Sequence, residues 1–262
     1  MLGDLVVTKY NSGCLRSILL KSHNIGTEEI PELYQLVGAA AEAHHEAALK
    51  AAGELYVREH TIKAQLSENV EYSGRADFVR HLADGTVVDE VKGHTSKNTR
   101  LDVIRKGEYN VSYLAQLVSY MVKLRTNRGR LICGYWEEDT NGAYVQQEQR
   151  IFRAEIQDDG GVSVDGAPSG YFVADLLAHQ RAAVRVLEGQ EVGPRPDKWN
   201  QKWGGPCQMC AFKAACDTYD AAPCSTEEFL QLAEEAVEAL EPRDPPVINK
   251  VKPPKRKKGD AA

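Results

Sequence analysis

The run Gly74-Arg75-Ala76-Asp77, and the run Val87-Val88-Asp89-Glu90-Val91-Lys92 that follows the dipeptide Asp84-Gly85, decide how this chain folds. Both runs are typical of strands, and Asp-Gly is favoured in tight hairpin turns. We therefore expect an antiparallel hairpin with strands over residues 70–80 and 86–92. Because side chains alternate along a strand, Glu90 and Lys92 share one face and Asp89 lies on the opposite face.

A turn centred on Asp84-Gly85 also predicts the register of this hairpin. It pairs Asp77 with Lys92 and leaves Glu90 diagonal to Asp77. Diagonal neighbours are about 7–8 Å apart, so the two carboxylates can reach one hard cation such as Mg²⁺ between them. The alternative interpretation is a ladder of surface ion pairs on a solvated strand.

The rest of the chain alternates helical and strand-like patterns around this hairpin. Apolar spacing and Pro at a first turn indicate helices over residues 31–55, 112–124, 171–187 and 226–240. A second hairpin is expected over residues 130–136 and 143–156, around Asn141-Gly142. The segment after residue 242 is charged and rich in Pro, which is typical of disorder.

Composition places the chain among ordinary globular proteins. It has 262 residues, of which 42% are hydrophobic and 27% charged, with a formal net charge of −6. The negative charge argues against a generally basic nucleic-acid coat. No apolar run reaches the roughly 18 residues of a membrane span, and the first residues lack the features of a signal peptide. We expect a cytoplasmic protein in a reducing compartment, where cysteines bind metals more often than they form disulfides.

Cysteines are divided between the two ends of the chain in a pattern typical of metal ligands. One lies near the start and three form a C-x2-C-x5-C run: Cys14, Cys207, Cys210 and Cys216. Four thiolates are the set that zinc and iron–sulfur clusters require. Cys224 is a weaker candidate for the fourth ligand should Cys14 be free. Cys133 lies in an apolar run and is expected to be a buried core residue.

Gln116 and Tyr120 stand four residues apart, on one face of the predicted helix over residues 112–124. With the hairpin and the cysteines in the same order, the chain resembles the RecB-type branch of the PD-(D/E)XK nuclease superfamily. More narrowly, it is similar to the iron–sulfur-containing exonucleases of that branch, including CRISPR-associated and phage members. The resemblance covers roughly residues 10–220 and implies an α/β, restriction-endonuclease-like core, with a mixed central sheet flanked by helices.

The resemblance implies roles for individual residues. Asp77 and Glu90 would bind the metal, and Lys92 would position the attacking water or stabilise the developing charge. Gln116 and Tyr120 would hold the site and the nucleic-acid strand in register. The family also supplies a metal-binding histidine from its first helix, and His45 fits that pattern better than the neighbouring His44. A single histidine on an apolar helix is otherwise a packed core residue.

The implied cofactors are Mg²⁺ or Mn²⁺ and a [4Fe-4S] cluster on the four cysteines, with zinc as the alternative. The implied activity is DNA exonuclease action, on single-stranded ends, in DNA processing, recombination or CRISPR spacer acquisition. Protein partners would belong to a recombination or CRISPR adaptation complex, in a bacterial, archaeal or phage-infected cell. The rival interpretations are a non-catalytic DNA-end-binding or assembly subunit, and a zinc-stabilised interaction protein without a nucleic-acid role.

These expectations divide the chain into four parts. Residues 1–25 would supply one cluster cysteine, residues 26–190 the nuclease core, residues 191–241 the iron–sulfur segment and an acidic helix, and residues 242–262 a disordered basic tail. A basic stretch follows the second strand of the first hairpin and could steer a nucleic-acid backbone or be a solvated loop. It contains His94, Lys97, Arg100, Arg105 and Lys106.

Overall fold

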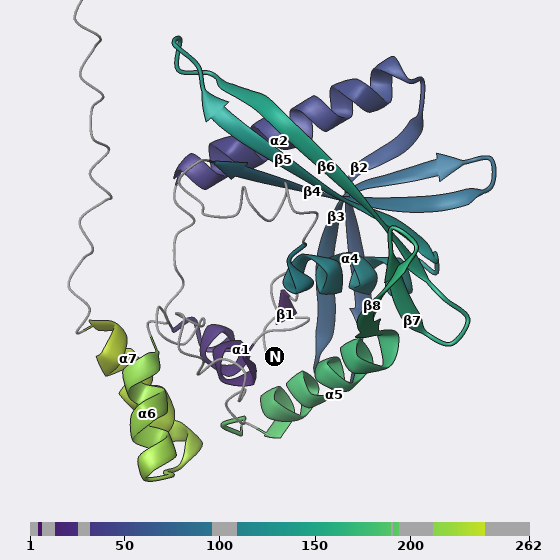
Figure 1. Ribbon diagram of the computed structural model, residues 1–262. Coiled ribbons are helices and arrows are strands. Elements are labelled where there is room, and N and C mark those ends of the chain that lie inside the picture. Colours follow the sequence, from purple (N-terminus) through teal and green to yellow (C-terminus); the bar gives the residue numbers. More distant parts are fainter. Residues whose placement is uncertain are drawn as a thin grey trace, which may run out of the picture.

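A computed structural model of the chain describes residues 5–6, 14–25, 32–95, 109–189, 191–193 and 212–238 (Figure 1). Its strands are β1 (Leu5–Val6), β2 (Leu55–Gln65), β3 (Glu71–Leu82), β4 (Gly85–Thr95), β5 (Arg128–Glu138), β6 (Tyr144–Ile156), β7 (Gly161–Val164) and β8 (Ala167–Phe172). Its helices are α1 (Leu15–Ser22), α2 (Glu32–Ala51), α4 (Val111–Lys123), α5 (Val173–Gly189), α6 (Lys213–Ala221) and α7 (Thr226–Glu238). None of these helices is long and apolar enough to cross a membrane.

The strands form one eight-stranded sheet in the order β1-β3-β4-β5-β6-β7-β8, with β2 paired to the free side of β3. β1 is parallel to β3 and β4 is parallel to β5, whereas the other neighbours are antiparallel. Helices pack on the sheet, so the predicted α/β core with a mixed sheet flanked by helices is confirmed.

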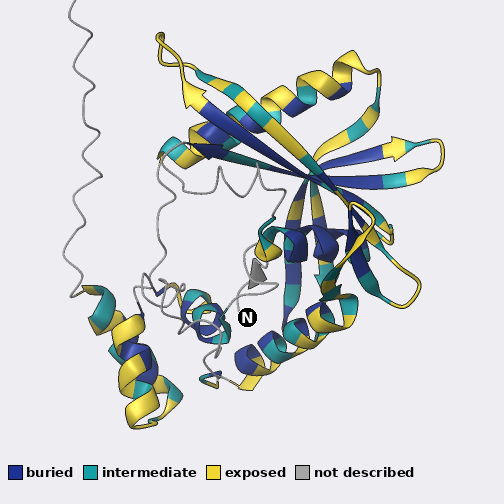
Figure 2. Cartoon of the chain, in the orientation of Figure 1, coloured by how far each residue is buried: buried dark blue, intermediate teal, exposed yellow. Residues whose placement is uncertain are grey.

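Helices cover both faces of the sheet, and the two faces have separate apolar cores (Figures 1 and 2). On one face, α2 packs Val37, Ala41 and Leu49 against Phe78 and Val91. On the other face, α4 contributes to the larger core, and its members there are Leu114, Leu117, Val118, Tyr120 and Met121. The central strands β3, β4 and β5 therefore pack against apolar cores on both faces, and the Asp89 and Glu90 side chains of β4 are completely buried.

The first hairpin forms where the sequence predicts it, but its register differs from the prediction. The paired residues run from Leu82 opposite Gly85 to Phe78 opposite Asp89. Continuing this ladder by one residue places Asp77 opposite Glu90, so the expected pairing of Asp77 with Lys92 is wrong. The observed partner of each residue lies two positions from the predicted partner. Because side chains alternate with a period of two residues, every side chain stays on its predicted face.

The difference arises at the turn, which consists of Ala83 and Asp84. Gly85 already begins β4, with a φ of 128° that favours glycine. Arg128 of β5 donates to the Asp84 carboxylate (Nη1–Oδ2, 2.6 Å) and to the Asp84 carbonyl (Nη2–O, 3.0 Å). A contact with a residue 44 positions away in the sequence therefore helps to fix this turn. A prediction based on local turn preferences does not take such a contact into account.

The other predicted elements are present with small changes at their ends. The four predicted helices correspond to α2, α4, α5 and α7, and the second predicted hairpin to β5 and β6. α2 ends at Ala51 because Gly53 adopts a left-handed φ of 66°, and Leu55 then starts β2, a strand that was not predicted. The outer strand β2 is exposed at most positions, and Ile62 is its one buried residue. Residues 242–262, the predicted disordered tail, lie outside the described residues.

The two ends of the chain pack together beside α5. Leu19 and Leu20 of α1 share an apolar cluster with Cys216 of α6 and Phe229 of α7. Arg16 is 4% exposed and donates to the carbonyl oxygen of Gly193 (2.8 Å). This arrangement agrees with a small helical unit built from both ends, although the predicted domain boundaries stay predictions.

Candidate active site

A fork between β3 and β4 creates the candidate site. The two strands pair only as far as Phe78 and Asp89, and β4 then continues alongside β5 as far as Thr95. Asp77 stands at the point of separation, where its Oδ2 accepts a hydrogen bond from the backbone amide of Val91 (2.7 Å). The Asp77 carboxylate thus accepts a hydrogen bond that a backbone carbonyl group would accept in a continuous β-ladder. This bond fixes the position of the carboxylate.

Glu90 lies beside this fork and is completely buried. Its Oε1 forms an ion pair with the ammonium group of Lys92, whose side chain is 22% exposed. Its Oε2 is buried and has no hydrogen-bond partner in the described part of the chain. A buried carboxylate oxygen without a partner is costly, because its desolvation is not compensated. A bound cation would supply the missing partner, so the donor set fits a metal.

The charges of the three groups act on one another. Burial, followed by the negative charge of Glu90, raises the pKa of Asp77 to about 8. Burial alone would lower the pKa of Lys92, but the charges of Glu90 and Asp77 outweigh it and raise that pKa. Burial also raises the pKa of Glu90. The site therefore contains two carboxylates for one ammonium group, and additional positive charge would stabilise it.

Glu42 of α2 is a further acidic residue near this site that the sequence did not indicate. Its charge contributes to the raised pKa values of both Asp77 and Glu90. Its Oε2 lies 3.2 Å from Arg58 Nη2, and its side chain is 23% exposed. The sequence of α2 contains several acidic residues. Which of them lies near the site depends on how this helix crosses β4, and the sequence does not indicate that crossing.

Gln116 and Tyr120 are neighbours on one face of α4, as their spacing predicts. Gln116 Nε2 donates to the Tyr120 hydroxyl (3.0 Å). Tyr120 is completely buried, and burial followed by the charge of Glu90 raises the pKa of its hydroxyl. A Cβ atom at Gly74 of β3 would lie 2.8 Å from Tyr120 Cε1, so this glycine makes room for the ring. The structure thus brings Tyr120 close to Glu90.

His45 is placed elsewhere, on the opposite face of the sheet. Its Nε2 lies 2.9 Å from Oδ2 of the completely buried Asp89. Asp89 also pairs with Arg80 (Nε–Oδ2, 3.0 Å) and with Arg130 (Nε–Oδ1, 2.8 Å). Burial alone would raise the pKa of Asp89, but its bonds to Arg130 and His45 and the charge of Arg80 outweigh burial and lower the pKa. Because Asp89 and Glu90 point to opposite faces, the structure does not bring His45 to the Asp77 and Glu90 carboxylates.

His44 does not replace His45 at the site. Its ring packs edge-on against Trp136, with a centroid distance of 5.7 Å, in the region covered by α2. Within the described ranges, no group of three or more His, Cys, Asp or Glu side chains could hold a metal ion. The site therefore offers Asp77 and Glu90 as direct ligands. Mg²⁺ is commonly bound by one or two carboxylates together with waters and substrate phosphates.

The expected cluster cysteines are described only in part, because Cys207 and Cys210 lie outside the described residues. Cys14 is half-buried immediately before α1, and Cys216 is buried in α6. Arg16, close to Cys14 in sequence, donates to the Cys216 carbonyl (3.4 Å). The segments that carry the first and last expected ligands therefore lie close together.

The other two cysteines both lie in apolar surroundings. Cys133 is 4% exposed in the main core, as predicted, and burial raises the pKa of its thiol to about 12. Cys224 is half-buried and packs against the apolar cluster of α1, α6 and α7. Of the predicted basic stretch, only His94 is described; it lies within β4 and is buried beside Tyr113 (ring centroids 6.1 Å apart).

Comparison with known proteins agrees with this geometry. A model of the PD-(D/E)XK nuclease superfamily matches residues 19–217. The chain belongs to this superfamily. The matched range includes Asp77, Glu90 and Lys92, the residues expected to form the superfamily's motif. No curated protein matches the chain.

Several solved structures have a similar fold at low sequence identity. LHK-Exo, an alkaline exonuclease from Laribacter hongkongensis, is 14% identical over 72% of this chain and 90% of its own, with a TM-score of 0.47. Its complex with dAMP is 16% identical over the same shares, with a TM-score of 0.48. A phage-related exonuclease from Haemophilus somnus 129PT is 9% identical over 67% of this chain and 79% of its own, with a TM-score of 0.42.

The site residues are suited to metal-assisted hydrolysis of a phosphodiester. A divalent cation between Asp77 and Glu90 would neutralise charge on the phosphate and lower the pKa of its bound water. Lys92 remains protonated beside two carboxylates and offers a positive charge to the phosphate or to the attacking oxygen. Tyr120 and Gln116 form a fixed hydrogen-bonded pair next to Glu90.

Proposed function

We propose that the chain is a metal-dependent DNA exonuclease that hydrolyses phosphodiester bonds at single-stranded ends. The observation that carries this proposal is the completely buried Glu90, whose Oε2 lacks a hydrogen-bond partner among the described residues, next to Asp77 and Lys92. A solvated ladder of ion pairs would leave these carboxylates in water. Here Glu90 is completely buried, Asp77 is half-buried, and one ammonium group faces two carboxylates, which favours a metal site over a structural ion pair.

Mg²⁺ or Mn²⁺ is the proposed catalytic metal, because carboxylate oxygens suit both ions. We propose further that Cys14, Cys207, Cys210 and Cys216 bind a [4Fe-4S] cluster. The packing of α1 against α6, with Cys14 and Cys216 in or beside these helices, supports a centre that joins the chain ends. The proposed setting is DNA processing, recombination or CRISPR spacer acquisition, as in the RecB-type exonucleases that the sequence resembles.

End-labelled single- and double-stranded DNA, incubated with Mg²⁺, Mn²⁺ or EDTA, tests the activity. We expect cleavage from an end with either metal and none with EDTA. Glu90→Gln and Lys92→Ala should each reduce the rate by at least about 10³-fold, since each removes a charge needed in the transition state. Asp84→Asn, at the exposed hairpin turn, is the control and should cleave like the wild type. Full activity of both site variants would refute the proposal, and DNA-end binding without any cleavage would identify a non-catalytic subunit.

Spectroscopy tests the metal centre independently of activity. Protein purified without oxygen should be brown with broad visible absorption, and Cys207→Ala should bleach and destabilise it. Cys133→Ala, in the main core, is the matched control and should keep the colour. Colourless protein with stoichiometric zinc would instead establish a zinc site.

A further inference from the structure

One row of side chains connects the candidate site to β6. Lys92 of β4 is paired with Cys133 of β5, and Cys133 is paired with Arg150 of β6. Residues paired across neighbouring strands point to the same face of a sheet. Arg150 therefore lies on the face of the candidate site, two strand spacings or about 10 Å from Lys92. Between them Cys133 is small and buried.

The guanidinium group of Arg150 is positioned yet accessible. It lies 5.3 Å from the centroid of the Phe152 ring and 3.5 Å from Asp165 Oδ2, and its side chain is 46% exposed. An ion pair of this length at the surface contributes little free energy. Asp165 is itself fixed, because its Oδ1 accepts a hydrogen bond from the Arg153 backbone amide (2.9 Å). A ligand with a stronger negative charge could therefore displace Asp165 from Arg150.

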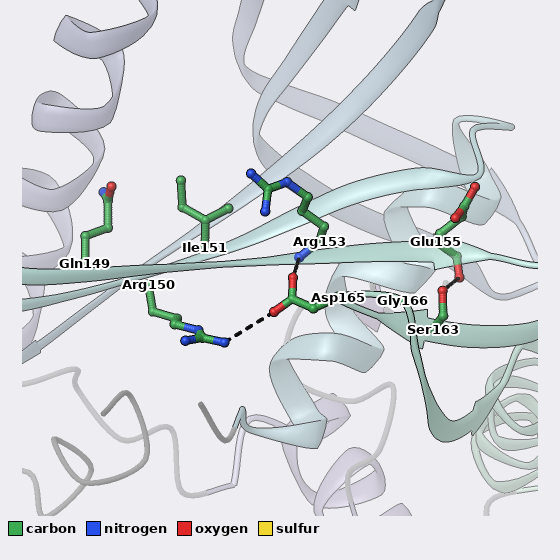
Figure 3. A pocket seen from close by; sticks show the side chains of 8 residues that line it. All are labelled: Gln149, Arg150, Ile151, Arg153, Glu155, Ser163, Asp165 and Gly166. Atoms are coloured by element: carbon green, nitrogen blue, oxygen red, sulfur yellow. Dashed lines mark hydrogen bonds and ion pairs between the residues drawn. The ribbon is translucent and has the colours of Figure 1, made fainter. Parts of the chain in front are cut away.

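A hollow of about 570 Å³ lies at this edge of β6 and includes both Arg150 and Arg153 in its lining. Figure 3 shows Arg150 and Arg153 leaving the strand in opposite directions. Arg153 belongs to the row of Asp89 and Arg130, on the other face of the sheet. The two arginines are thus three residues apart on one strand but only Arg150 shares the face of the candidate site.

Aromatic rings lie next to Lys92 and next to Arg150. The Tyr113 ring centroid is 5.2 Å from Lys92 Nζ. Tyr109 packs edge-on against Phe152 (5.6 Å between centroids), the ring that also contacts Arg150. Half-buried tyrosines beside cationic groups are typical of surfaces that bind single-stranded nucleic acid, where bases stack and phosphates pair.

We propose that Arg150 binds a backbone phosphate of the nucleic-acid strand whose end occupies the Asp77 and Glu90 site. This inference rests on the proposed function. The distance of about 10 Å corresponds to roughly three nucleotides of a stacked strand and to fewer of an extended one. The planar guanidinium forms two parallel hydrogen bonds with a phosphate, which replaces its long contact with Asp165.

Binding of a fluorescent dT20 oligonucleotide, measured by anisotropy in EDTA, tests the proposal without cleavage. Arg150→Ala should weaken binding about five- to tenfold at about 0.1 M salt and reduce the log–log salt slope by about 0.7, the loss of one phosphate contact. Arg153→Ala removes the same charge from the same strand but from the other face, and should change the affinity less than twofold. Equal effects of the two variants, or no binding by the wild-type chain, would overturn the proposal.

A kinetic comparison locates the contact. Arg150→Ala should raise KM for a long single strand about fivefold but leave hydrolysis of thymidine 5′-p-nitrophenyl phosphate unchanged, because this small ester reaches only the metal site. An equal loss on both substrates would place the effect of Arg150 in the candidate site and refute a separate phosphate contact. If the wild-type chain binds dT20 but cleaves neither substrate, the proposed nuclease function fails, while the binding comparison still decides the role of Arg150.

Discussion

The Asp77 carboxylate accepts a hydrogen bond from the backbone amide of Val91 at the point where β4 leaves β3. One side chain thus terminates the ladder and also belongs to the acidic group of the candidate site. Because Val91 lies between Glu90 and Lys92, this bond fixes the backbone from which both of those side chains project. The geometry of the site is therefore built into the end of a hairpin rather than into a mobile loop.

The pKa of Asp77 predicts how the stability of the metal-free protein depends on pH. The pKa is raised from 3.8 to about 8, so between these values the folded state binds a proton that the unfolded state has lost. This contribution to stability is fully present below about pH 4 and is lost as the pH rises through about 8, with a slope of up to about 1.4 kcal/mol per pH unit. Urea unfolding in EDTA at pH 5 and pH 9 measures it.

Asp77→Asn provides the comparison, because the amide has no proton to lose. The difference in unfolding free energy between pH 5 and pH 9 should shrink by a few kcal/mol in this variant. Asp84→Asn, at the exposed turn, should keep the wild-type dependence. An unchanged pH dependence in Asp77→Asn would contradict the raised pKa.

Alternation along the strands was enough to predict which side chains share a face, but not which residues pair. The faces depend only on the two-residue period of a strand, so Glu90 and Lys92 were placed correctly relative to Asp89. The register depends on the turn. The turn is determined by the conformation of Gly85 and by the contact between Arg128 and Asp84. Such a contact between distant residues leaves no local signal in the sequence.

The sequence could not choose among the residues of α2 for a related reason. The helical period allows His44 and His45 equally, and it gives no preference to Glu42. The crossing of α2 over β4 determines which of these side chains lies near the site. The helix crosses closely at Gly93, where a Cβ atom would touch Val37 of that helix. This contact fixes the helix on the sheet and leaves His45 next to Asp89, whereas the charge of Glu42 acts on Asp77.

Substitutions on α2 separate a metal ligand from a structural residue. His45→Ala should lower the unfolding free energy by about 1–3 kcal/mol, because the buried Asp89 loses one hydrogen bond. It should change the affinity for Mn²⁺ less than twofold. Glu42→Gln removes a negative charge near both site carboxylates and should weaken Mn²⁺ binding roughly fivefold, or by about 1 kcal/mol.

Calorimetric titration with Mn²⁺ and thermal unfolding measure these two effects on the same samples. Glu46→Gln, one turn further along α2, is the control for Glu42→Gln, because Glu46 pairs with the same Arg58 and also with Lys50. Loss of Mn²⁺ binding in His45→Ala with unchanged stability would reverse the assignment and make His45 the ligand.

Gly93 of β4 and Gly38 of α2 should respond in opposite ways to alanine. A Cβ atom at Gly93 would lie 2.8 Å from both Cγ1 and the carbonyl oxygen of Val37, and the backbone oxygen cannot move without the helix. Gly93→Ala should therefore destabilise the fold by about 1–3 kcal/mol. At Gly38 nothing lies within 4 Å of the added carbon, so Gly38→Ala should stabilise α2 by up to about 1 kcal/mol. Urea unfolding distinguishes the two, and equal stabilities would show that α2 does not press on β4.

Arg16 should be the residue on which the packing of the two chain ends depends most strongly. Its buried guanidinium donates to Gly193 O (2.8 Å), Cys216 O (3.4 Å) and Asp220 Oδ1 (2.6 Å), and it lies 5.0 Å from the Tyr219 ring centroid. Arg16→Ala leaves these acceptors without their donor and should cost about 2–4 kcal/mol. Arg16→Lys should recover little, because an ammonium group cannot reproduce the planar fork.

Urea unfolding and hydrogen exchange of α6 measure this effect in both variants. The helical unit formed by α1, α6 and α7 should open locally before the sheet unfolds. The amides of α6 should therefore exchange faster in Arg16→Ala, while the amides of β4 stay protected. Arg185→Ala, exposed on α5, controls for the loss of a positive charge and should behave like the wild type. Wild-type protection of α6 in Arg16→Ala would show that the apolar contacts of Leu19, Leu20 and Phe229 suffice to join the two ends.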